Sequence, residues 1–333
     1  MEHGRADVLL VSLGSTAGLR ASDEEFAGSL RRAGARVAVV AAAAQPQVRT
    51  FALTDLRWAR AARAAARGGI ERERPHAIVY STTTAALLWP APGAIRYDAP
   101  ATATRPGRHG IWQRPVEARR LRGASLLIAT APGTLAETAE PHADALVVPI
   151  PVEPSGLGEP WALREVAALT YAADPHKKGL DRVLAAWAQA RREGETLVVA
   201  GLAPERLPRP PAGVEVAGPL TREAYRALLR RARVFVTAPR REDHGIAQLE
   251  ALADGCVLVT TPAPGPYAAL ELARTLDRRL VTDDLAPAIR IALDDPAPRY
   301  VARSIDLLAP HMRAAVDQIV RSELLPRLLG EPV

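Results

Sequence analysis

The amino-acid sequence predicts an α/β fold with two domains, each built on a doubly wound parallel β-sheet. Two observations lead to this prediction. The chain has 333 residues, 48% of them hydrophobic, which is enough to fill two cores of about 150 residues each. Short β-branched runs alternate with polar segments of helical length along the chain, and this alternation is typical of βα units that feed a parallel sheet.

The first half of the chain holds the apolar runs of the first expected sheet. We expect its strands at residues 8–13, 37–41, 77–80, 126–129 and 145–148. Ser22 and Glu25 form an S-x-x-E capping box, which predicts a helix start at that point. Gly34 stands where this helix should end.

A proline-rich stretch, PIPVEPSGLGEP at residues 149–160, interrupts the alternation and predicts a linker. The alternation then restarts, with strands expected at residues 166–171, 196–200, 214–217, 234–237 and 257–260. We expect a first domain at residues 1–152, a second at 153–309, and a C-terminal helix at 310–333 that crosses back to the first domain. Parallel sheets bind ligands beyond the carboxyl ends of their strands, so two sheets facing each other across a cleft would place function on those loops.

Composition limits the compartment and the partners. No apolar run reaches the roughly 20 residues that span a bilayer, and charges at Glu2, Arg5 and Asp7 occupy the place of a signal peptide's apolar stretch. One cysteine, Cys256, excludes an internal disulfide. We therefore expect a cytoplasmic protein. The net charge is +6, but aromatics are only 4% of residues and no basic-aromatic motif appears, which argues against nucleic-acid binding.

Lys177 and Lys178 are adjacent and are the only lysines of the chain. Every other strongly basic side chain is an arginine. The two lysines stand between an expected strand and a helix that begins near Gly179. A lysine just before a helix N-terminus combines a mobile cation with amide donors, and this combination suits a phosphate. A solvated loop with two surface lysines is the alternative interpretation.

A second segment combines two carboxylates with a helix start. Glu242 lies in the loop after an expected strand, Gly245 opens the next helix, and Glu250 lies on that helix. The amides of His244, Gly245 and Ile246 can receive an anion there. Carboxylates tolerate a nearby phosphate when they accept hydrogen bonds from sugar hydroxyls. A glutamate at a helix start can also serve only as a complement to the helix dipole.

The K-G pair followed by a helix, and E-x7-E within E-D-x-G-I-x-x-L-E-A-x-A-x-G, resemble the large family of retaining GT-B glycosyltransferases that includes bacterial mannosyl- and glucosyltransferases. The resemblance covers residues 166–266, and the first half resembles the family only in architecture. It implies a GT-B fold of two Rossmann-like domains, with the acceptor side in the first and the nucleotide-sugar site in the second. It also implies hexose transfer from a nucleotide-diphosphate sugar with retention, and no cofactor.

Carried over residue by residue, the resemblance implies that Lys178 contacts the donor diphosphate and that Glu242 hydrogen-bonds the transferred sugar. The amides from His244 to Ile246 would hold the distal phosphate or sugar hydroxyls. Glu250 would bind the ribose.

Further positions match the family's backbone contacts. Gly218 and Pro219 stand where that backbone meets the nucleobase, and Gly14 corresponds to the loop that faces the donor from the opposite domain. The segment RPGRHGIWQRP at residues 105–115, with three arginines, one histidine and one tryptophan, follows a first-domain strand and is a candidate lining for the acceptor side. The residues proposed for the acceptor side are Asp98, Arg108 and His109.

The sequence departs from the family at two positions. The family usually has an arginine about five residues before the lysine, where this chain has Ala173. Either Lys177, Arg240 or Arg241 then supplies the second cation for the phosphates, or the site has no second cation. The family often has an aromatic residue where this chain has His244.

Metal binding is not expected. Asp283 and Asp284 precede a helical run and read as a cap, and Asp294 and Asp295 follow that run before a proline. The seven histidines show no ligand spacing.

A basic helix raises the question of a membrane partner. Arg57, Arg60, Arg63 and Arg67 fall roughly on one face of an alanine-rich helix. A solvated basic face is one interpretation. Peripheral docking to an anionic membrane, at its inner face, is the other, and it would suit a lipid-linked or cell-wall glycan acceptor.

Retention without an evident nucleophile predicts a front-face displacement, in which the departing phosphate takes the acceptor proton and the protein stabilises the leaving group. Two alternatives stay open. A nucleotide-sugar 2-epimerase shares the fold but needs acid and base groups at the sugar. A non-catalytic relic, suggested by Ala173, would bind nucleotide sugar and turn nothing over.

Overall fold

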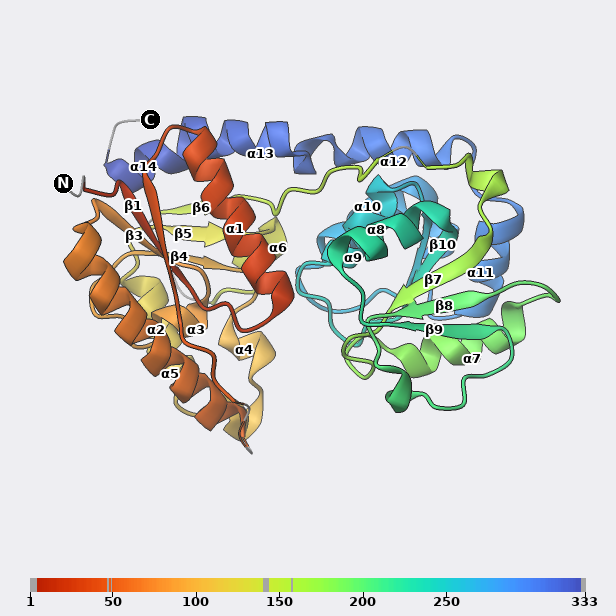
Figure 1. Cartoon of the computed structure of the whole chain (residues 1–333), viewed down its shortest axis with the longest axis horizontal. Helices are drawn as coiled ribbons and strands as arrows, with labels where there is room; N and C mark the ends of the chain where they lie inside the picture. The colour runs from red at the N-terminus through yellow and green to blue at the C-terminus, as the bar shows by residue number, and fades with distance from the viewer. Residues whose placement is uncertain (1–4, 47, 49, 140–143, 157, 331–333) are drawn as a thin grey trace. The chain divides into compact units, whose positions relative to one another are not determined.

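The computed structural model describes residues 5–46, 48, 50–139, 144–156 and 158–330. They form two compact units, the first made of Met1–Pro151 and Arg313–Val333 and the second of Val152–Met312. Each unit is an α/β layer structure around one parallel sheet (Figure 1). The expected fold class, two parallel-sheet α/β units, is confirmed.

The sheet of the first unit has six strands in the order β2-β1-β3-β4-β5-β6, and all neighbours are parallel. The strands are β1 (Val8–Ser12), β2 (Val37–Ala41), β3 (Ala77–Tyr80), β4 (Ala94–Tyr97), β5 (Leu127–Ala129) and β6 (Ala145–Val147). Strand order reverses between β1 and β3, which makes the loops after these two strands the switch point of this sheet.

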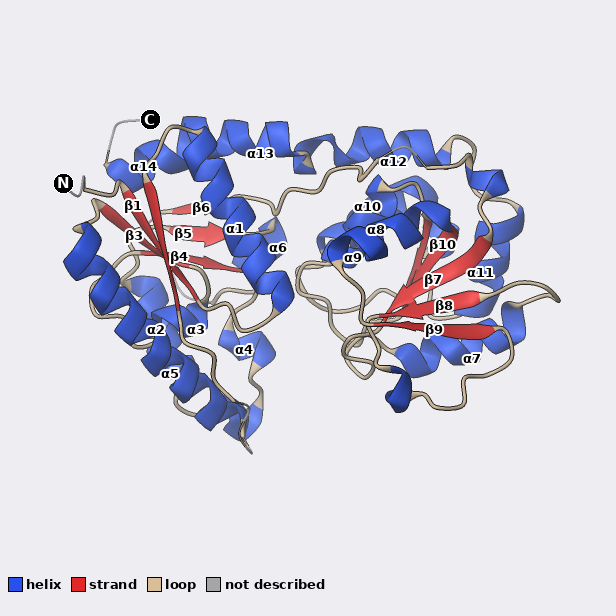
Figure 2. Ribbon diagram, viewed as in Figure 1, coloured by secondary structure: helices blue, strands red, loops and turns tan. Residues whose placement is uncertain are grey.

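Helices cover both faces of this sheet (Figure 2). Val8 and Leu10 of β1 pack with α1 and the C-terminal segment, whereas the alternating Leu9 and Val11 pack with α2, α3 and α5. The helices are α1 (Ala17–Arg32), α2 (Phe51–Glu73), α3 (Thr83–Ala86), α4 (Ala101–Thr104), a 3-10 turn (Gly107–Gly110), α5 (Gln113–Arg122) and α6 (Pro132–Ala136).

The C-terminal segment belongs to this first unit. It consists of α13 (Arg313–Ile319), a π-helical turn (Val320–Leu324) and α14 (Leu325–Leu329). Val316, Val320 and Leu324 are buried in the same cluster as Leu30 of α1, and Arg32 pairs with Asp317 at 2.6 Å. The segment is therefore part of the core of the first unit.

Two expectations for the first unit were wrong. β4 was missed because its short run, AIRY, carries Arg96, which resembles the charge of a polar segment. The structure buries Arg96, whose guanidinium lies 3.4 Å from Asp23 and donates to Ser22 Oγ at 2.7 Å. The capping box is also wrong, because the N-cap of α1 lies six residues earlier, at Thr16, whose Oγ1 accepts from the amide of Leu19 at 3.2 Å.

The sheet of the second unit has five parallel strands in the order β11-β10-β7-β8-β9. They are β7 (Val166–Tyr171), β8 (Leu197–Ala200), β9 (Val214–Gly218), β10 (Ala232–Thr237) and β11 (Val257–Thr260), close to the expected strands. The switch point of this sheet lies between β7 and β10.

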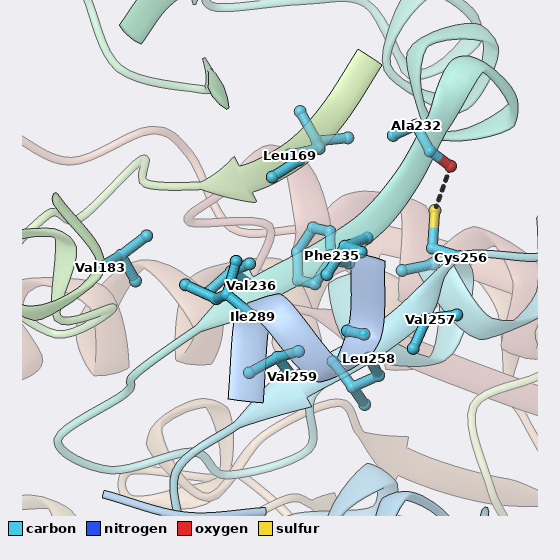
Figure 3. Packing of buried hydrophobic residues seen from close by; sticks show 14 of the residues in the cluster. Leu169, Val183, Ala232, Phe235, Val236, Cys256, Val257, Leu258, Val259 and Ile289 are labelled. Carbon is cyan, nitrogen blue, oxygen red and sulfur yellow. Dashed lines mark hydrogen bonds between the residues drawn. The ribbon is translucent and has the colours of Figure 1, made fainter. Parts of the chain in front are cut away.

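The helices of the second unit are α7 (Leu180–Ala190), α8 (Arg222–Arg231), α9 (Ile246–Ala253), α10 (Ala268–Asp277), α11 (Leu285–Asp294) and α12 (Tyr300–Leu308), with 3-10 turns at Trp161–Leu163, Pro204–Arg206, Arg278–Leu280 and Ala309–His311. The strands and helices enclose one apolar core, in which Phe235 of β10 lies near Leu169 of β7 and Ile289 of α11 (Figure 3). Cys256 is buried there, and its thiol donates to the carbonyl oxygens of Leu229 and Ala232.

The expected linker spans the boundary between the units, which falls between Pro151 and Val152. The amide of Val152 donates to His311 O at 2.9 Å, and Ser155 donates to the Asp254 carboxylate. The second part of the proline-rich stretch is thus held by the second unit. Among the described residues, no helix has both the length and the apolar composition that crossing a bilayer requires.

Candidate functional site

Two loops at the switch point of the second unit carry the chemistry. One follows β7 and contains Lys178, and the other follows β10 and contains Glu242. Since β7 and β10 are parallel neighbours, both loops leave the same edge of the sheet. They are tied together by the amide of Arg240, which donates to Lys177 O at 3.0 Å, and by the guanidinium of Arg240, which donates to His176 O at 2.6 Å.

Gly179 explains why these loops can approach each other so closely. It is the N-cap of α7 and has a left-handed backbone, with φ 65° and ψ 38°. A Cβ at this position would overlap the carbonyl oxygen of Ala238, which follows β10. Glycine is therefore required for packing, and the K-G pair places Lys178 against the β10 loop.

Lys178 and Glu242, the two residues with the sharpest predicted roles, lie in contact. Lys178 Nζ donates to Glu242 Oε2 at 2.6 Å. Gln248, in the first turn of α9, donates through Nε2 to the same Oε2 at 3.0 Å. Glu242 and Gln248 are buried, so this ion pair is largely shielded from water.

The start of α9 lies beside this pair. Gly245 is the N-cap, with φ 86° and ψ 42°, and a Cβ there would come within 2.9 Å of the Tyr267 ring. Ile246 is the first helical residue, and His244 is buried in the position where the family often has an aromatic ring. The helix N-terminus therefore adds amide donors and positive potential at the edge of the sheet.

Asp243 binds two further cations. Lys177 Nζ lies 2.8 Å from its Oδ2, and Arg241 Nε lies 2.7 Å from its Oδ1. Burial acts to raise the pKa of Asp243, but the charges and hydrogen bonds of Lys177 and Arg241 outweigh it and hold the pKa below its ordinary value. Of the cations considered for the missing arginine, Arg240 instead pairs with Asp181 at 2.7 Å, in the first turn of α7.

Glu250 lies one further turn along α9 and is held by two arginines of α8. Arg222 and Arg226 donate to its Oε1 at 3.3 and 3.4 Å. Burial raises the pKa of Glu250, and Arg226 and Arg222 oppose the rise. Arg226 also pairs with Asp254 at 2.6 Å. Arg226 was missed from the sequence, because one arginine among so many gives no local signal.

Gly218 and Pro219 lie at the carboxyl end of β9, on the edge of the sheet. Gly218 has φ 78°, and its carbonyl accepts from the amide of Gly201, after β8, at 2.8 Å. Gly218 and Pro219 therefore lie at the carboxyl ends of the strands, as do Lys178 and Glu242, but on the outermost strand, three positions from β10.

The remaining candidates belong to the first unit. Gly14, with φ 58°, is in the loop after β1 at that sheet's switch point; its carbonyl accepts from Arg20 at 2.8 Å. Asp98 follows β4 and is exposed. Arg108 and His109 are exposed in the 3-10 turn before α5, where the His109 ring packs edge-on to Phe51 at 5.6 Å between centroids.

The paired aspartates do not gather into a metal site. Asp284 is the N-cap residue of α11, Asp294 pairs with Arg192 and Arg290, and Asp295 pairs with Arg279. In the part of the chain that the structure describes, no three His, Cys, Asp or Glu side chains cluster in a way that could hold a metal ion.

Comparisons with known proteins bear on the fold and on residues 166–295. Residues 166–295 match the family model described as Glycosyl transferases group 1. A sequence search of curated proteins finds no significant match. The fold is similar to that of sucrose-phosphate synthase from Thermosynechococcus elongatus, with 14% identity, a TM-score of 0.67 and coverage of 98% of this chain and 100% of that one.

Two further solved structures are similar over nearly the whole chain. HepE from Anabaena, in complex with UDP-glucose, has 15% identity and a TM-score of 0.69, with 95% of this chain and 98% of that one covered. The α,α-trehalose 6-phosphate synthase from Burkholderia multivorans has 14% identity and a TM-score of 0.66, with 98% of each chain covered. The chain therefore has the GT-B fold and carries a glycosyltransferase domain at residues 166–295.

Proposed function

We propose that this protein transfers a hexose from a nucleotide-diphosphate sugar to an acceptor hydroxyl, with retention of anomeric configuration and without a metal ion. The observation that carries the proposal is the contact of Lys178 with Glu242, 2.6 Å apart, at the switch point of the second unit and beside the N-terminus of α9. A cation, amide donors and a carboxylate are the groups that a sugar diphosphate needs.

In the proposed reaction the bond between the sugar C1 and the diphosphate oxygen breaks, and a bond between C1 and the acceptor oxygen forms on the same face. The acceptor proton passes to the departing diphosphate, so that no enzymic base is required. Negative charge grows on the diphosphate as the bond breaks, and Lys178 with the amides of Gly245 and Ile246 stabilises it.

The neighbouring residues take the roles expected from the sequence. Glu242 accepts a hydrogen bond from a hydroxyl of the transferred sugar, and Glu250 accepts one from the ribose. Gly218 and Pro219 meet the nucleobase. We assign the second cation to Lys177 or Arg241, because they adjoin Lys178 and Glu242 in sequence and both contact Asp243, whereas Arg240 is held by Asp181 on α7.

Metal independence follows from this distribution of charge. The carboxylates of the β10 loop, Glu242 and Asp243, are each paired with lysine or arginine, which leaves the diphosphate charge to the cations and amides. We expect transfer to persist in excess EDTA. Activity that EDTA abolishes and that Mg²⁺ or Mn²⁺ restores would contradict this part of the proposal.

The donor is the first unknown to resolve. Binding of UDP-, GDP- and ADP-sugars should be measured by calorimetry, starting with UDP-glucose because the similar HepE structure contains it. Binders should then be incubated with and without candidate acceptors. Epimerisation of the donor alone would favour the 2-epimerase, and binding without turnover on any acceptor would favour the non-catalytic relic.

We further propose that an acceptor on a lipid or a cell-wall glycan is met at an anionic membrane. On α2, the exposed residues Leu53, Arg57, Arg60, Ala64 and Arg67 follow the spacing i, i+4, i+7, i+11, i+14 and so form one outward stripe. Arg63 lies off this stripe, half-buried, and donates to Leu88 O at 3.1 Å.

Three large apolar side chains are exposed around the first turn of this helix. Phe51 is 57% exposed, Leu53 53% and Ile111 70%. The acidic residue within residues 51–67 and 101–116 is Asp55, which is buried and paired with Arg105 at 2.8 Å. Apolar groups beside unopposed arginines suit the boundary between headgroups and acyl chains of anionic lipid.

Vesicle sedimentation tests this contact. Each exposed arginine contributes about 1 kcal/mol near an anionic surface, so the protein should sediment with phosphatidylglycerol vesicles at low salt and not with phosphatidylcholine vesicles. Arg57→Glu with Arg60→Glu should release it, whereas Arg182→Glu with Arg191→Glu on the second unit should not. If the wild type does not sediment with these vesicles at low salt, the membrane contact is wrong and the arginines form only a solvated basic face.

A further inference from the structure

We propose that Gln248 is a positioning residue that fixes the Glu242 carboxylate for the transferred sugar and so lets the site distinguish a nucleotide sugar from the bare nucleotide. This inference rests on the proposed donor site. Gln248 stands at an unspecified position within the motif that the resemblance identified, so the resemblance gives it no role, and it is 1% exposed on α9.

The orientation of the Gln248 amide follows from its neighbour. A carboxylate can only accept, so the group 3.0 Å from Glu242 Oε2 must be the NH₂ of Gln248. Lys178 Nζ donates to this same oxygen at 2.6 Å. Both hydrogen bonds are therefore made to Oε2, and no described residue donates to Oε1 of Glu242. The oxygen left for a sugar hydroxyl is Oε1.

The backbone of Glu242 is fixed independently of its side chain. Its amide donates to Pro264 O at 3.0 Å, and Gly265 packs so closely on the Glu242 carbonyl that a Cβ at Gly265 would overlap it. With the main chain held, the rotation of the carboxylate depends on Lys178 and Gln248.

Donor binding changes the balance between these two donors. When the diphosphate arrives, it competes with Glu242 for the ammonium of Lys178, because both acceptors are anionic. Gln248 is uncharged and has no attraction to the diphosphate comparable to that of a cation. It then remains as the donor that keeps Oε2 in place and Oε1 turned toward the sugar.

The test compares affinities for UDP and UDP-glucose, with GDP/GDP-mannose and ADP/ADP-glucose as parallel pairs. Gln248→Met keeps the length of the side chain and removes its amide. A buried hydrogen bond to a charged group is strong enough that its loss should weaken UDP-glucose binding about tenfold or more, while UDP binding changes less than about twofold because UDP lacks the sugar. Gln189→Met, at an exposed position on α7, is the control and should change neither affinity.

Gln248→Glu provides a second measurement. The added carboxylate faces Glu242, with Lys178, His244 and Tyr267 as the other titratable neighbours, and it can donate only when protonated. Because the terminal phosphate of UDP also titrates in this range, each affinity of the variant is divided by that of the wild type at the same pH. This ratio for UDP-glucose should be low at pH 8 and recover toward pH 5.5, whereas a purely structural defect would lower the ratios for UDP and UDP-glucose at every pH.

The possible failures are distinguishable. If Gln248→Met weakens UDP and UDP-glucose binding equally, or weakens neither, the positioning role is wrong and the donor site stands. If the wild-type protein binds none of the nucleotide sugars, the inference fails together with the donor site proposed for Glu242.

Discussion

Lys178 is the residue on which the proposed chemistry depends most. In the proposed reaction its ammonium faces the diphosphate oxygens on which charge grows, so it should help the transition state more than the bound donor. We predict that Lys178→Ala lowers kcat by about 10²–10³, with a much smaller loss of nucleotide affinity. Steady-state kinetics and calorimetry with the nucleotide measure the two effects.

Lys177→Ala is the matched comparison, since Lys177 differs from Lys178 mainly in its partner, Asp243. Its effect on kcat should be smaller. If Lys177 supplies the missing second cation, the two losses will instead be comparable and strongly non-additive in the double variant. Nearly full turnover by Lys178→Ala would overturn the assignment of this loop to the diphosphate.

Glu250 should act on binding and not on the chemical step. A ribose contact is present in both the ground state and the transition state, so its loss mainly raises KM. We predict that Glu250→Gln, which retains an acceptor for Arg222 and Arg226 but loses the charge, raises KM for the donor several-fold at nearly constant kcat. A large fall in kcat with KM unchanged would exclude the ribose role.

At this scale, part of the site was predictable. Lys178 and Glu242 were predicted as site residues because a K-G pair and E-x7-E mark loops that end at helix starts, and the structure places their side chains in contact. Gln248 and Arg226 were not, because Gln248 occupies an unspecified position of the motif and Arg226 lies outside it, and only the tertiary structure brings Gln248 to Glu242 and Arg226 to Glu250.

Among the elements, the two switch-point loops of the second unit depend on each other through Gly179. Alanine there would combine left-handed strain with overlap of the Ala238 carbonyl. We predict that Gly179→Ala lowers kcat/KM at least as much as Lys178→Ala, because it separates Lys178 from the β10 loop. Gly194→Ala has a similar left-handed φ of 79° but no neighbour within 4 Å, and should leave kcat/KM unchanged.

The same pair of loops should show a defined pH dependence through Asp243. Because the pKa of Asp243 is lowered from its ordinary value of 3.8, its contribution to stability is complete above that value and is lost as pH falls through the lowered pKa. We predict that Asp243→Asn reduces the free energy of unfolding at pH 7 and that its difference from wild type shrinks below about pH 4. Urea unfolding measures both, with the exposed Asp306→Asn as control. A difference that grew toward acid pH would contradict the pairing.

The elements themselves were largely predictable because alternation of apolar and polar segments reports directly on βα units. The second unit's strands fall close to their expected bounds. The exceptions in the first unit have one cause: the pairing of Arg96 with Asp23 and Ser22. The charge of Arg96 makes its strand resemble a polar segment. Its partners Ser22 and Asp23 lie within α1 but are residue types typical of a helix cap.

On the scale of the whole molecule, the C-terminal segment completes the apolar core of the first unit. Leu324 is fully buried in the cluster that includes Val8 and Leu30. We predict that Leu324→Ala destabilises the first unit by about 2–5 kcal/mol. Hydrogen exchange should show lost protection in β1 and β3 with the second unit's strands unchanged. Leu163→Ala, at an exposed site, is the control, and equal loss of protection in both units would contradict the division of the core.

This closure has a consequence for synthesis on the ribosome. Residues 5–151 emerge first, but the cluster formed by Val8, Leu10 and Leu30 lacks Val316, Val320 and Leu324 until the entire second unit has been translated. At about 5–20 residues per second, the roughly 160 residues between take on the order of ten seconds or more. The nascent first half therefore waits with part of the apolar surface on one face of its sheet uncovered beside α1, while the second unit, continuous in sequence, has every residue it needs to fold.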